Sequence, residues 1–235
     1  MSARTTSAVG DTDTTVTQDY LKAVWAASEW GGGASITGLA RRMGVAPSTA
    51  SENVARLVEA GLLEHEPYRA VTLSKEGRRR ACLMVRRHRL LETYLVERLG
   101  FDWDEVHAEA EELEHACSER LLGALDEALG HPVRDPHGDP IPLPDGRIVQ
   151  PELRGLDTVS VGRTAVVARI DDDSAPLRQL AGAGIGLDTP IVVVDRPAAE
   201  SGGRRTRRPT TIRAVLAPEG TGEVVVPAGA LWVLA

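Results

Sequence analysis

The sequence predicts a mainly α-helical chain with a small β domain at its C-terminal end. Apolar side chains recur at helical spacing in residues 19–30, 35–43 and 78–130, which favours helices. Beyond about residue 153, short valine-rich runs separated by Gly, Pro and Asp favour strands. At 235 residues, the chain is long enough for two or three small domains, each with a modest core.

The N-terminal helices are predicted to include a helix-turn-helix. A first helix covers residues 19–30 and ends at a GGG run. The next helix covers roughly residues 35–43, a turn is centred on Gly44, and a further helix begins at Pro47. A small residue in the turn and polar residues at the exposed start of the following helix are typical of this motif, with an ordinary helical hairpin as the alternative.

The stretch LLEHEPYRAVTLSKEG alternates into two short strands around Pro67 and Tyr68, like the wing of a winged helix. This favours a winged helix-turn-helix over a plain hairpin, and the second helix of that motif enters the major groove of double-stranded DNA. Lys75 would lie near a phosphate. The other predicted DNA-binding residues are Pro47, Ser48, Thr49, Ser51, Glu52, Arg56 and Arg69.

The charge distribution supports a nucleic-acid partner. The whole chain has a net charge of −7. Residues 34–90 nevertheless hold 11 Arg or Lys against 5 Asp or Glu, which is +6 and leaves −13 for the rest. A basic segment inside an acidic protein is the electrostatic footprint of DNA binding.

The stretch VHAEAEELEH, residues 106–115, is dense in histidine and glutamate. Read as a helix, it has an apolar face and a second face about 100° wide with ligand-type side chains. That second face consists of His107, Glu111, Glu114 and His115. RRHRLLE upstream repeats the pattern of His and Glu at helical spacing, with His88 and Glu92 four residues apart. The two segments together predict a metal site with nitrogen and oxygen ligands, and a solvated amphipathic helix is the alternative.

The C-terminal part is predicted as a small β-barrel that follows a proline-rich linker. RDPHGDPIP has three prolines and two turn signals, which favours a linker. The strands are expected at TAVVARI, PIVVVDR, TTIRAVLA, GEVVVP and ALWVLA. The arginine-rich insert at residues 196–210 favours a solvated hairpin tip over a DNA contact.

Several classes of protein are disfavoured. No apolar run reaches the roughly 18 residues of a membrane span, and the polar N-terminus does not resemble a signal peptide, so a soluble cytoplasmic protein without a membrane partner is expected. Two cysteines, Cys82 and Cys117, do not make a disulfide framework or a thiolate zinc site. Both are expected to be small buried residues on helices.

A winged helix, HRLLE, VHxEAxxLEH, PHGDPIP and a small β domain, in this order, resemble the diphtheria toxin repressor family of metal-dependent transcriptional regulators. The resemblance covers nearly the whole chain after residue 15. The polar residues 1–15 are expected to form a disordered extension, and the resemblance implies a winged helix-turn-helix domain at 16–83. It further implies a helical dimerisation and metal-binding domain with the linker at 84–152, and an SH3-like β-barrel at 153–235.

The resemblance also implies two metal sites in each subunit. The primary site would use Asp19, Glu111, Glu114 and His115. The ancillary site would use His88, Glu92 and His107, with Asp172 or Asp173 lent by the barrel. Iron-responsive members have Met and Cys where this sequence has Asp19 and Glu111, as manganese-responsive members do. Oxygen ligands suit Mn²⁺, with Fe²⁺ and Co²⁺ as alternatives.

By this resemblance the protein is not an enzyme but a homodimeric repressor. It is expected to bind a DNA operator and repress manganese uptake genes when Mn²⁺ is bound, with two dimers on one operator as a further option. Lys22 stands where two-domain manganese regulators have Glu, which favours two mononuclear sites. An iron-responsive repressor is the first alternative, and a carboxylate-bridged metal enzyme is the second.

Overall fold

A computed structural model describes most of the chain. The described residues are 14–30, 33–171, 174–195, 211–216, 222–227 and 229–234. They divide into two compact units. Unit 1 lies within Met1–Arg87 and includes Pro142–Arg147, and unit 2 lies within His88–Ile141 and Ile148–Ala235. Each unit is described by itself.

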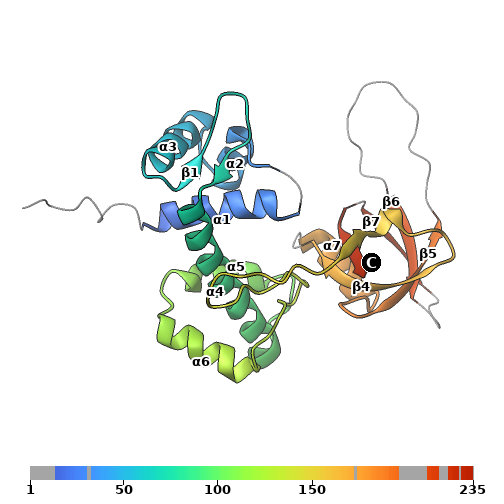
Figure 1. Ribbon diagram of the computed structural model, residues 1–235. Coiled ribbons are helices and arrows are strands. Elements are labelled where there is room, and N and C mark those ends of the chain that lie inside the picture. Colours follow the sequence, from blue (N-terminus) through green and yellow to red (C-terminus); the bar gives the residue numbers. More distant parts are fainter. Residues whose placement is uncertain are drawn as a thin grey trace, which may run out of the picture. The chain divides into compact units, whose positions relative to one another are not determined.

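Three helices build most of unit 1 (Figure 1). Helix α1 spans Thr15–Glu29, α2 spans Ile36–Arg42 and α3 spans Pro47–Glu59. The side chain of Ser35 caps α2 by accepting a hydrogen bond from the Gly38 N–H at 3.0 Å. The proline at the first position of α3 has no N–H to leave unsatisfied there.

The turn between α2 and α3 is the one that the sequence predicts. Gly44 adopts a φ of 65°, a left-handed conformation that glycine adopts without a steric penalty. Val54 and Leu57 on the inner face of α3 are buried with Leu21 of α1. Periodic apolar side chains therefore fix which face of α3 is inside and leave its polar face to solvent.

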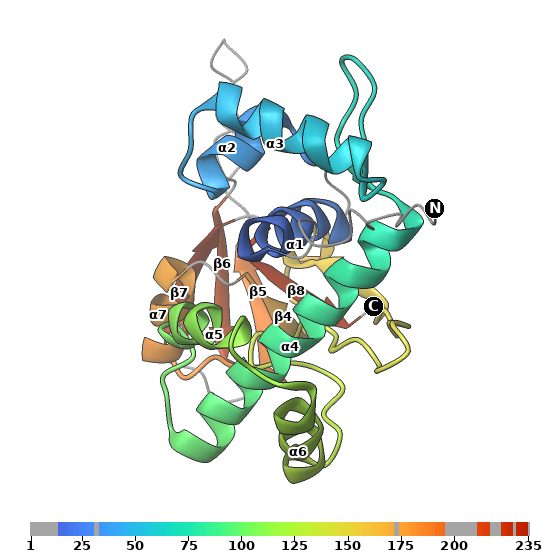
Figure 2. The same ribbon diagram turned by 90° about the vertical axis from the view of Figure 1, so that its left-hand side faces the viewer.

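A short hairpin follows α3. Strand β1, Leu63–Glu64, pairs antiparallel with β2, Thr72–Leu73. The predicted helix-turn-helix and wing are therefore present in unit 1. Figure 2 shows the β1–β2 loop and α3 at the same end of this unit.

Helix α4 spans Lys75–Leu99 and begins in unit 1. Its first turn lies against the chain just before the hairpin, because a Cβ at Gly77 would stand 1.9 Å from the Leu62 carbonyl oxygen. Residues 142–147 belong to the same unit: Arg86 donates a hydrogen bond to the Pro142 carbonyl oxygen at 2.7 Å. The Cys82 thiol donates to the Gly146 carbonyl oxygen at 3.1 Å.

The helical part of unit 2 contains the rest of α4 with α5, Val106–Glu114, and α6, Glu119–Leu129. Ser118 caps α6, and Gly130 ends it in the left-handed conformation. The buried side chains at the centre of this part are Leu91, Leu95, Val106, Ala110 and Leu125.

The predicted proline-rich linker is buried, in contrast to an exposed connection. Asp135 Oδ1 accepts hydrogen bonds from the N–H groups of His137 and Asp139, each at 2.9 Å, which makes a compact turn. The Ile170 N–H donates to the His137 carbonyl oxygen at 2.8 Å. Residues 134–141 of this stretch therefore build a compact turn packed inside unit 2.

A six-stranded antiparallel sheet makes up the C-terminal part, with the order β3-β8-β4-β5-β6-β7. The strands are β3 Leu153–Gly155, β4 Thr164–Ile170, β5 Pro190–Asp195, β6 Thr211–Leu216, β7 Glu223–Pro227 and β8 Leu231–Leu234. A 3-10 turn, Leu156–Thr158, and helix α7, Ser174–Gly182, accompany them. The sequence predicts β4 to β8 but neither β3 nor α7.

The prediction of a closed SH3-like barrel is wrong for the described residues. Strands β3 and β7 are the two edges of the sheet, and no described residues pair them. The side chains of Val167, Ile191 and Val233 are buried on one face of the sheet. Leu177 and Leu180 of α7 are buried in the same core. Valine-rich strands predict the sheet and its buried face, but they do not encode whether the edges meet.

Some sequence predictions lie outside the described residues. These are the extension up to residue 13 and the arginine-rich insert at 196–210. The division into three domains stays a prediction. No helix in the described ranges is both long and apolar enough to cross a membrane.

The contact at Gly77 gives a test of the packing of α4. Gly77→Ala forces a methyl group onto the Leu62 carbonyl, so we expect it to lower the free energy of unfolding by about 1–3 kcal/mol. Gly123→Ala is the matched control, because nothing lies within 4 Å of its Cβ position in α6. Equal stability of the two variants in urea unfolding would refute the packing argument.

Candidate metal centre

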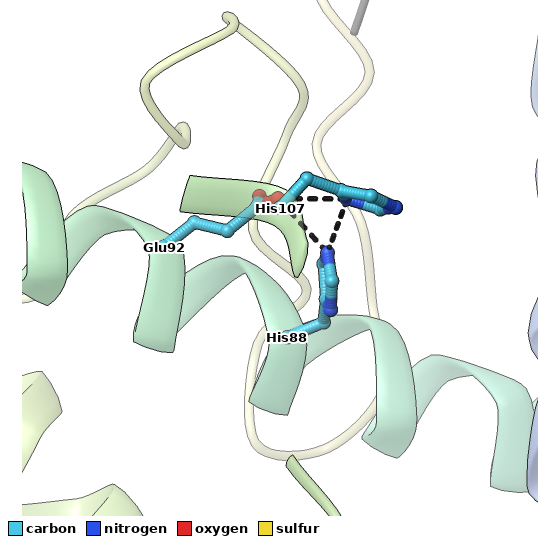
Figure 3. Close-up of side chains that lie close together, drawn as sticks. All are labelled: His88, Glu92 and His107. Carbon is cyan, nitrogen blue, oxygen red and sulfur yellow. Dashed lines mark hydrogen bonds and ion pairs between the residues drawn. The ribbon is translucent and has the colours of Figure 1, made fainter. Parts of the chain in front are cut away.

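Three potential metal ligands from two helices converge in unit 2, as Figure 3 shows. His88 and Glu92 lie one turn apart on α4, and His107 lies in the first turn of α5. His88 Nε2 lies 2.9 Å from Glu92 Oε1 and 3.0 Å from His107 Nδ1. His107 Nδ1 lies 3.1 Å from the same Glu92 oxygen. His88 and Glu92 are buried and His107 is half-buried, so the group opens to solvent on the α5 side.

The spacing of these three atoms fits a divalent cation. An ion in octahedral coordination with bonds of about 2.1 Å holds adjacent ligand atoms about 3 Å apart. The separations of 2.9, 3.0 and 3.1 Å are those of hydrogen bonds in the metal-free protein, and they also agree with that edge length. Imidazole nitrogen and carboxylate oxygen are ligands of divalent transition metals. His88, Glu92 and His107 therefore fit a metal ion in both chemistry and geometry.

The Glu92 carboxyl group is ionised although it is buried. Burial by itself raises the pKa of Glu92, but the charge of His88 and the hydrogen bonds from His107 and His88 hold it well below its usual value. The two imidazole rings thus stabilise the carboxylate in the metal-free protein. Glu92 offers a negatively charged ligand at neutral pH.

Glu114 supports His88 from the other side. Its side chain is buried, and its Oε2 lies 2.7 Å from His88 Nδ1. A carboxylate on one imidazole nitrogen fixes the ring so that the other nitrogen faces the metal. His88 Nε2 is the atom that faces Glu92 and His107. The resemblance gives Glu114 to the primary site, and in unit 2 one of its carboxylate oxygens contacts the ancillary ligand His88 while the other lies near the predicted primary ligand His115.

The other predicted primary ligands are His115, Glu111 and Asp19. His115 Nε2 lies 3.5 Å from Glu114 Oε1, just after the end of α5. Glu111 is exposed, and its Oε1 lies 3.6 Å from His107 Nε2. Unit 2 therefore brings together Glu111, Glu114 and His115 next to the His88 group. Asp19 is half-buried on α1, in unit 1.

Two residues near Glu92 were not predicted from the sequence as possible ligands. One ligand atom each of Glu92, Asp135 and His137 lies within 4.8 Å of the others, and all three residues are buried. His137 Nε2–H donates to the Trp103 carbonyl oxygen at 2.7 Å, and its other ring nitrogen, Nδ1, lies 4.0 Å from Glu92 Oε2. The D-x-H-x-D spacing inside RDPHGDPIP was the available signal, and its prolines masked it.

Among the described residues of unit 2, buried carboxyl groups outnumber buried guanidinium groups. The buried carboxyl groups are Glu92, Glu114, Asp135 and Asp139, against the guanidinium groups of Arg89 and Arg169. Arg89 Nε lies 3.4 Å from Asp135 Oδ2, and Arg169 Nε donates to Asp139 Oδ1 at 2.5 Å. Burial first, and then Asp139, raise the pKa of Asp135 to about 7.

The two predicted barrel ligands, Asp172 and Asp173, lie outside the described residues. The predicted DNA-binding residues belong to unit 1 and are all exposed. Those on α3 are Pro47, Ser48, Thr49, Ser51, Glu52 and Arg56, and Arg69 lies in the β1–β2 loop. Their exposure leaves this polar face available to a partner.

Comparison with known proteins identifies the family. The profile described as "Iron dependent repressor, N-terminal DNA binding domain" matches residues 13–71, and "Iron dependent repressor, metal binding and dimerisation domain" matches residues 74–143. The iron-dependent repressor IdeR of Mycobacterium leprae is 32% identical over 195 residues, which are 77% of this chain and 85% of that protein. The diphtheria toxin repressor of Corynebacterium efficiens is 29% identical over 75% of this chain and 82% of that protein.

Solved structures agree with this assignment. A manganese-dependent transcriptional repressor in complex with manganese is 47% identical, with a TM-score of 0.81 over 93% of this chain and 99% of that chain. The manganese regulator SloR is 25% identical, with a TM-score of 0.73 over 92% of this chain and 97% of that chain. These relatives are repressors and regulators, not enzymes. The chain belongs to the iron-dependent repressor family, which includes the diphtheria toxin repressors.

Proposed function

We propose that this protein is a manganese-dependent transcriptional repressor that binds operator DNA as a homodimer. The observation that carries the proposal is the triad of His88 Nε2, Glu92 Oε1 and His107 Nδ1, with mutual separations of 2.9 to 3.1 Å. The helix-turn-helix of unit 1 supplies a surface for DNA, and the matched dimerisation domain supports a homodimer. A repressor of this kind acts in the cytoplasm and turns off manganese uptake genes.

The primary site is proposed to use the four ligands that the family resemblance implies. Glu111, Glu114 and His115 lie together in unit 2, where like charges repel unless a cation or proton separates them. The family resemblance adds Asp19 from α1. A bound divalent ion supplies positive charge at these carboxylates. Asp19 and the α5 ligands would then hold the DNA-binding helices at a spacing that fits two half-sites.

Manganese is proposed over iron because the ligand set is hard. The predicted primary ligands are three carboxylates and one imidazole, and carboxylate oxygen suits Mn²⁺. A relative with 47% identity was solved with manganese. Iron dependence is the second candidate, favoured by the iron-dependent repressor with 32% identity. Co²⁺ has similar donor preferences and is a further candidate metal. On the DNA, one or two dimers would occupy each operator.

The ancillary site can be tested through Glu92. Glu92→Gln keeps the size of the side chain but removes the charge, so we expect the affinity for one of two Mn²⁺ ions per chain to fall at least about tenfold. His131→Ala is the control, because His131 is an exposed histidine whose contact is with Asp126 at 3.0 Å. Isothermal calorimetry measures both variants. Two ions bound by Glu92→Gln as tightly as by the parent would rule out the site.

The choice of metal can be tested at Asp19 and Glu111. Replacing both in one protein, Asp19→Met with Glu111→Cys, exchanges oxygen for sulfur donors, so the Mn²⁺ concentration needed for DNA binding should rise at least about tenfold. The requirement for Fe²⁺ or Co²⁺ should rise less. DNA-binding titrations with each metal measure the order of effectors. An unchanged Mn²⁺ requirement would show that neither residue is a ligand.

A further inference from the structure

The tip of the wing has an unusual tight turn. The Arg69 N–H donates to the Glu66 carbonyl oxygen at 3.0 Å, which closes a turn with Pro67 and Tyr68 at its centre. Tyr68 has a φ of 64°. Proline followed by a residue with positive φ is the pattern of a type II turn, and that second central position normally holds Gly or Asn. A bulky tyrosine therefore occupies the place where glycine fits best.

No contact among the described residues offsets the unfavourable positive φ of Tyr68. The Tyr68 side chain is fully exposed, at 106% of the reference value, so no described residue covers its ring. A side chain with a Cβ at positive φ destabilises the fold relative to glycine. A residue that breaks a local rule without an internal compensation points to an external role.

The position of the turn indicates the partner. The views in Figures 1 and 2 agree that the β1–β2 loop lies at the same end of unit 1 as α3. The polar side chains of Ser48, Thr49 and Ser51 are exposed on α3. Arg69, which directly follows Tyr68 in the chain, is exposed as well. A duplex backbone offers phosphates to an arginine and apolar deoxyribose faces to a neighbouring ring.

We propose that Tyr68 is a DNA-contacting residue of the wing. Its ring packs against the sugar–phosphate backbone at the edge of the minor groove, beside the half-site that α3 enters. Its hydroxyl group donates to a phosphate oxygen. The contact adds affinity without reading base identity, and Arg69 supplies the neighbouring positive charge. This inference rests on the proposed DNA-binding function.

The test separates fold from binding in one substitution. The probe is a duplex that the Mn²⁺-loaded parent protein selects from a random-sequence pool. Tyr68→Gly relieves the positive φ, so the melting temperature should stay equal or rise. Loss of the ring face that the duplex would cover should weaken binding of the selected duplex about tenfold. If Tyr68 had only a structural role, the Tyr68→Gly protein would instead melt at a lower temperature and bind the duplex as tightly as the parent.

Further variants sharpen the result. Tyr68→Phe should retain most of the affinity, because the ring remains. Arg69→Ala should lower both the affinity and the slope of affinity against salt concentration, by about one unit, whereas Tyr68→Gly should leave that slope unchanged. Val133→Ala is the control for removing an exposed apolar side chain, since Val133 is 78% exposed in unit 2. It should bind the duplex like the parent.

The outcomes distinguish this inference from the function on which it rests. A parent protein that selects no duplex refutes both. A parent that selects DNA, with Tyr68→Gly binding it equally well, overturns only the role of Tyr68. Equal DNA binding together with a changed oligomeric state of Tyr68→Gly in sedimentation would make the ring a protein contact, which also overturns the proposal.

Discussion

The buried carboxylate of Glu92 is the constraint on which the metal centre depends. Its Oε1 lies 2.9 Å from one imidazole nitrogen and 3.1 Å from another, on side chains from two different helices. A buried anion is costly unless opposite charge or hydrogen bonds compensate it. His88 and His107 supply this compensation without metal, and they can do so only while α4 and α5 keep their present contact. The same atoms that stabilise the fold are thus arranged as ligands.

This arrangement extends toward the C-terminal sheet within unit 2. Asp135 and His137 lie beside Glu92, and the same turn carries Asp139, which pairs with Arg169 on β4. The Arg169 guanidinium stacks on the Trp232 ring, 4.1 Å from its centre. A Cβ at Gly138 would stand 2.1 Å from the Ala168 carbonyl oxygen, so the turn and β4 are in close contact. Charge changes at Glu92 therefore occur in a rigid network that includes the sheet.

Sequence patterns predicted what local periodicity encodes. The turn at Gly44, the start of α3 at Pro47 and the ligand-bearing face of α5 follow from residue spacing alone. The repeated His and Glu spacing on two helices indicated a metal site, and the family resemblance assigned His88 and His107 to the same one. The contact of Glu114 with His88 was not predicted, since it depends on the angle at which α5 crosses α4.

The burial of the predicted linker and the open edges of the sheet have a common physical origin. RDPHGDPIP reads as a linker because prolines mark loops, but burial of its acids is decided by Arg89 and Arg169, which are distant in sequence. Closure of the sheet depends on a long-range pairing of its edge strands that no local pattern records. Both features depend on tertiary contacts, which single-sequence periodicity does not contain.

Coupling between metal and DNA follows if the ligands favour one arrangement of the two units. A ligand shifts such an equilibrium only by its differential affinity for the states. The most direct test is the affinity of the parent protein for its selected duplex, measured across free Mn²⁺ concentrations at constant ionic strength. The account predicts that affinity rises at least about a hundredfold as Mn²⁺ saturates the protein. Binding of equal strength in the presence of chelator and of saturating Mn²⁺ would contradict it.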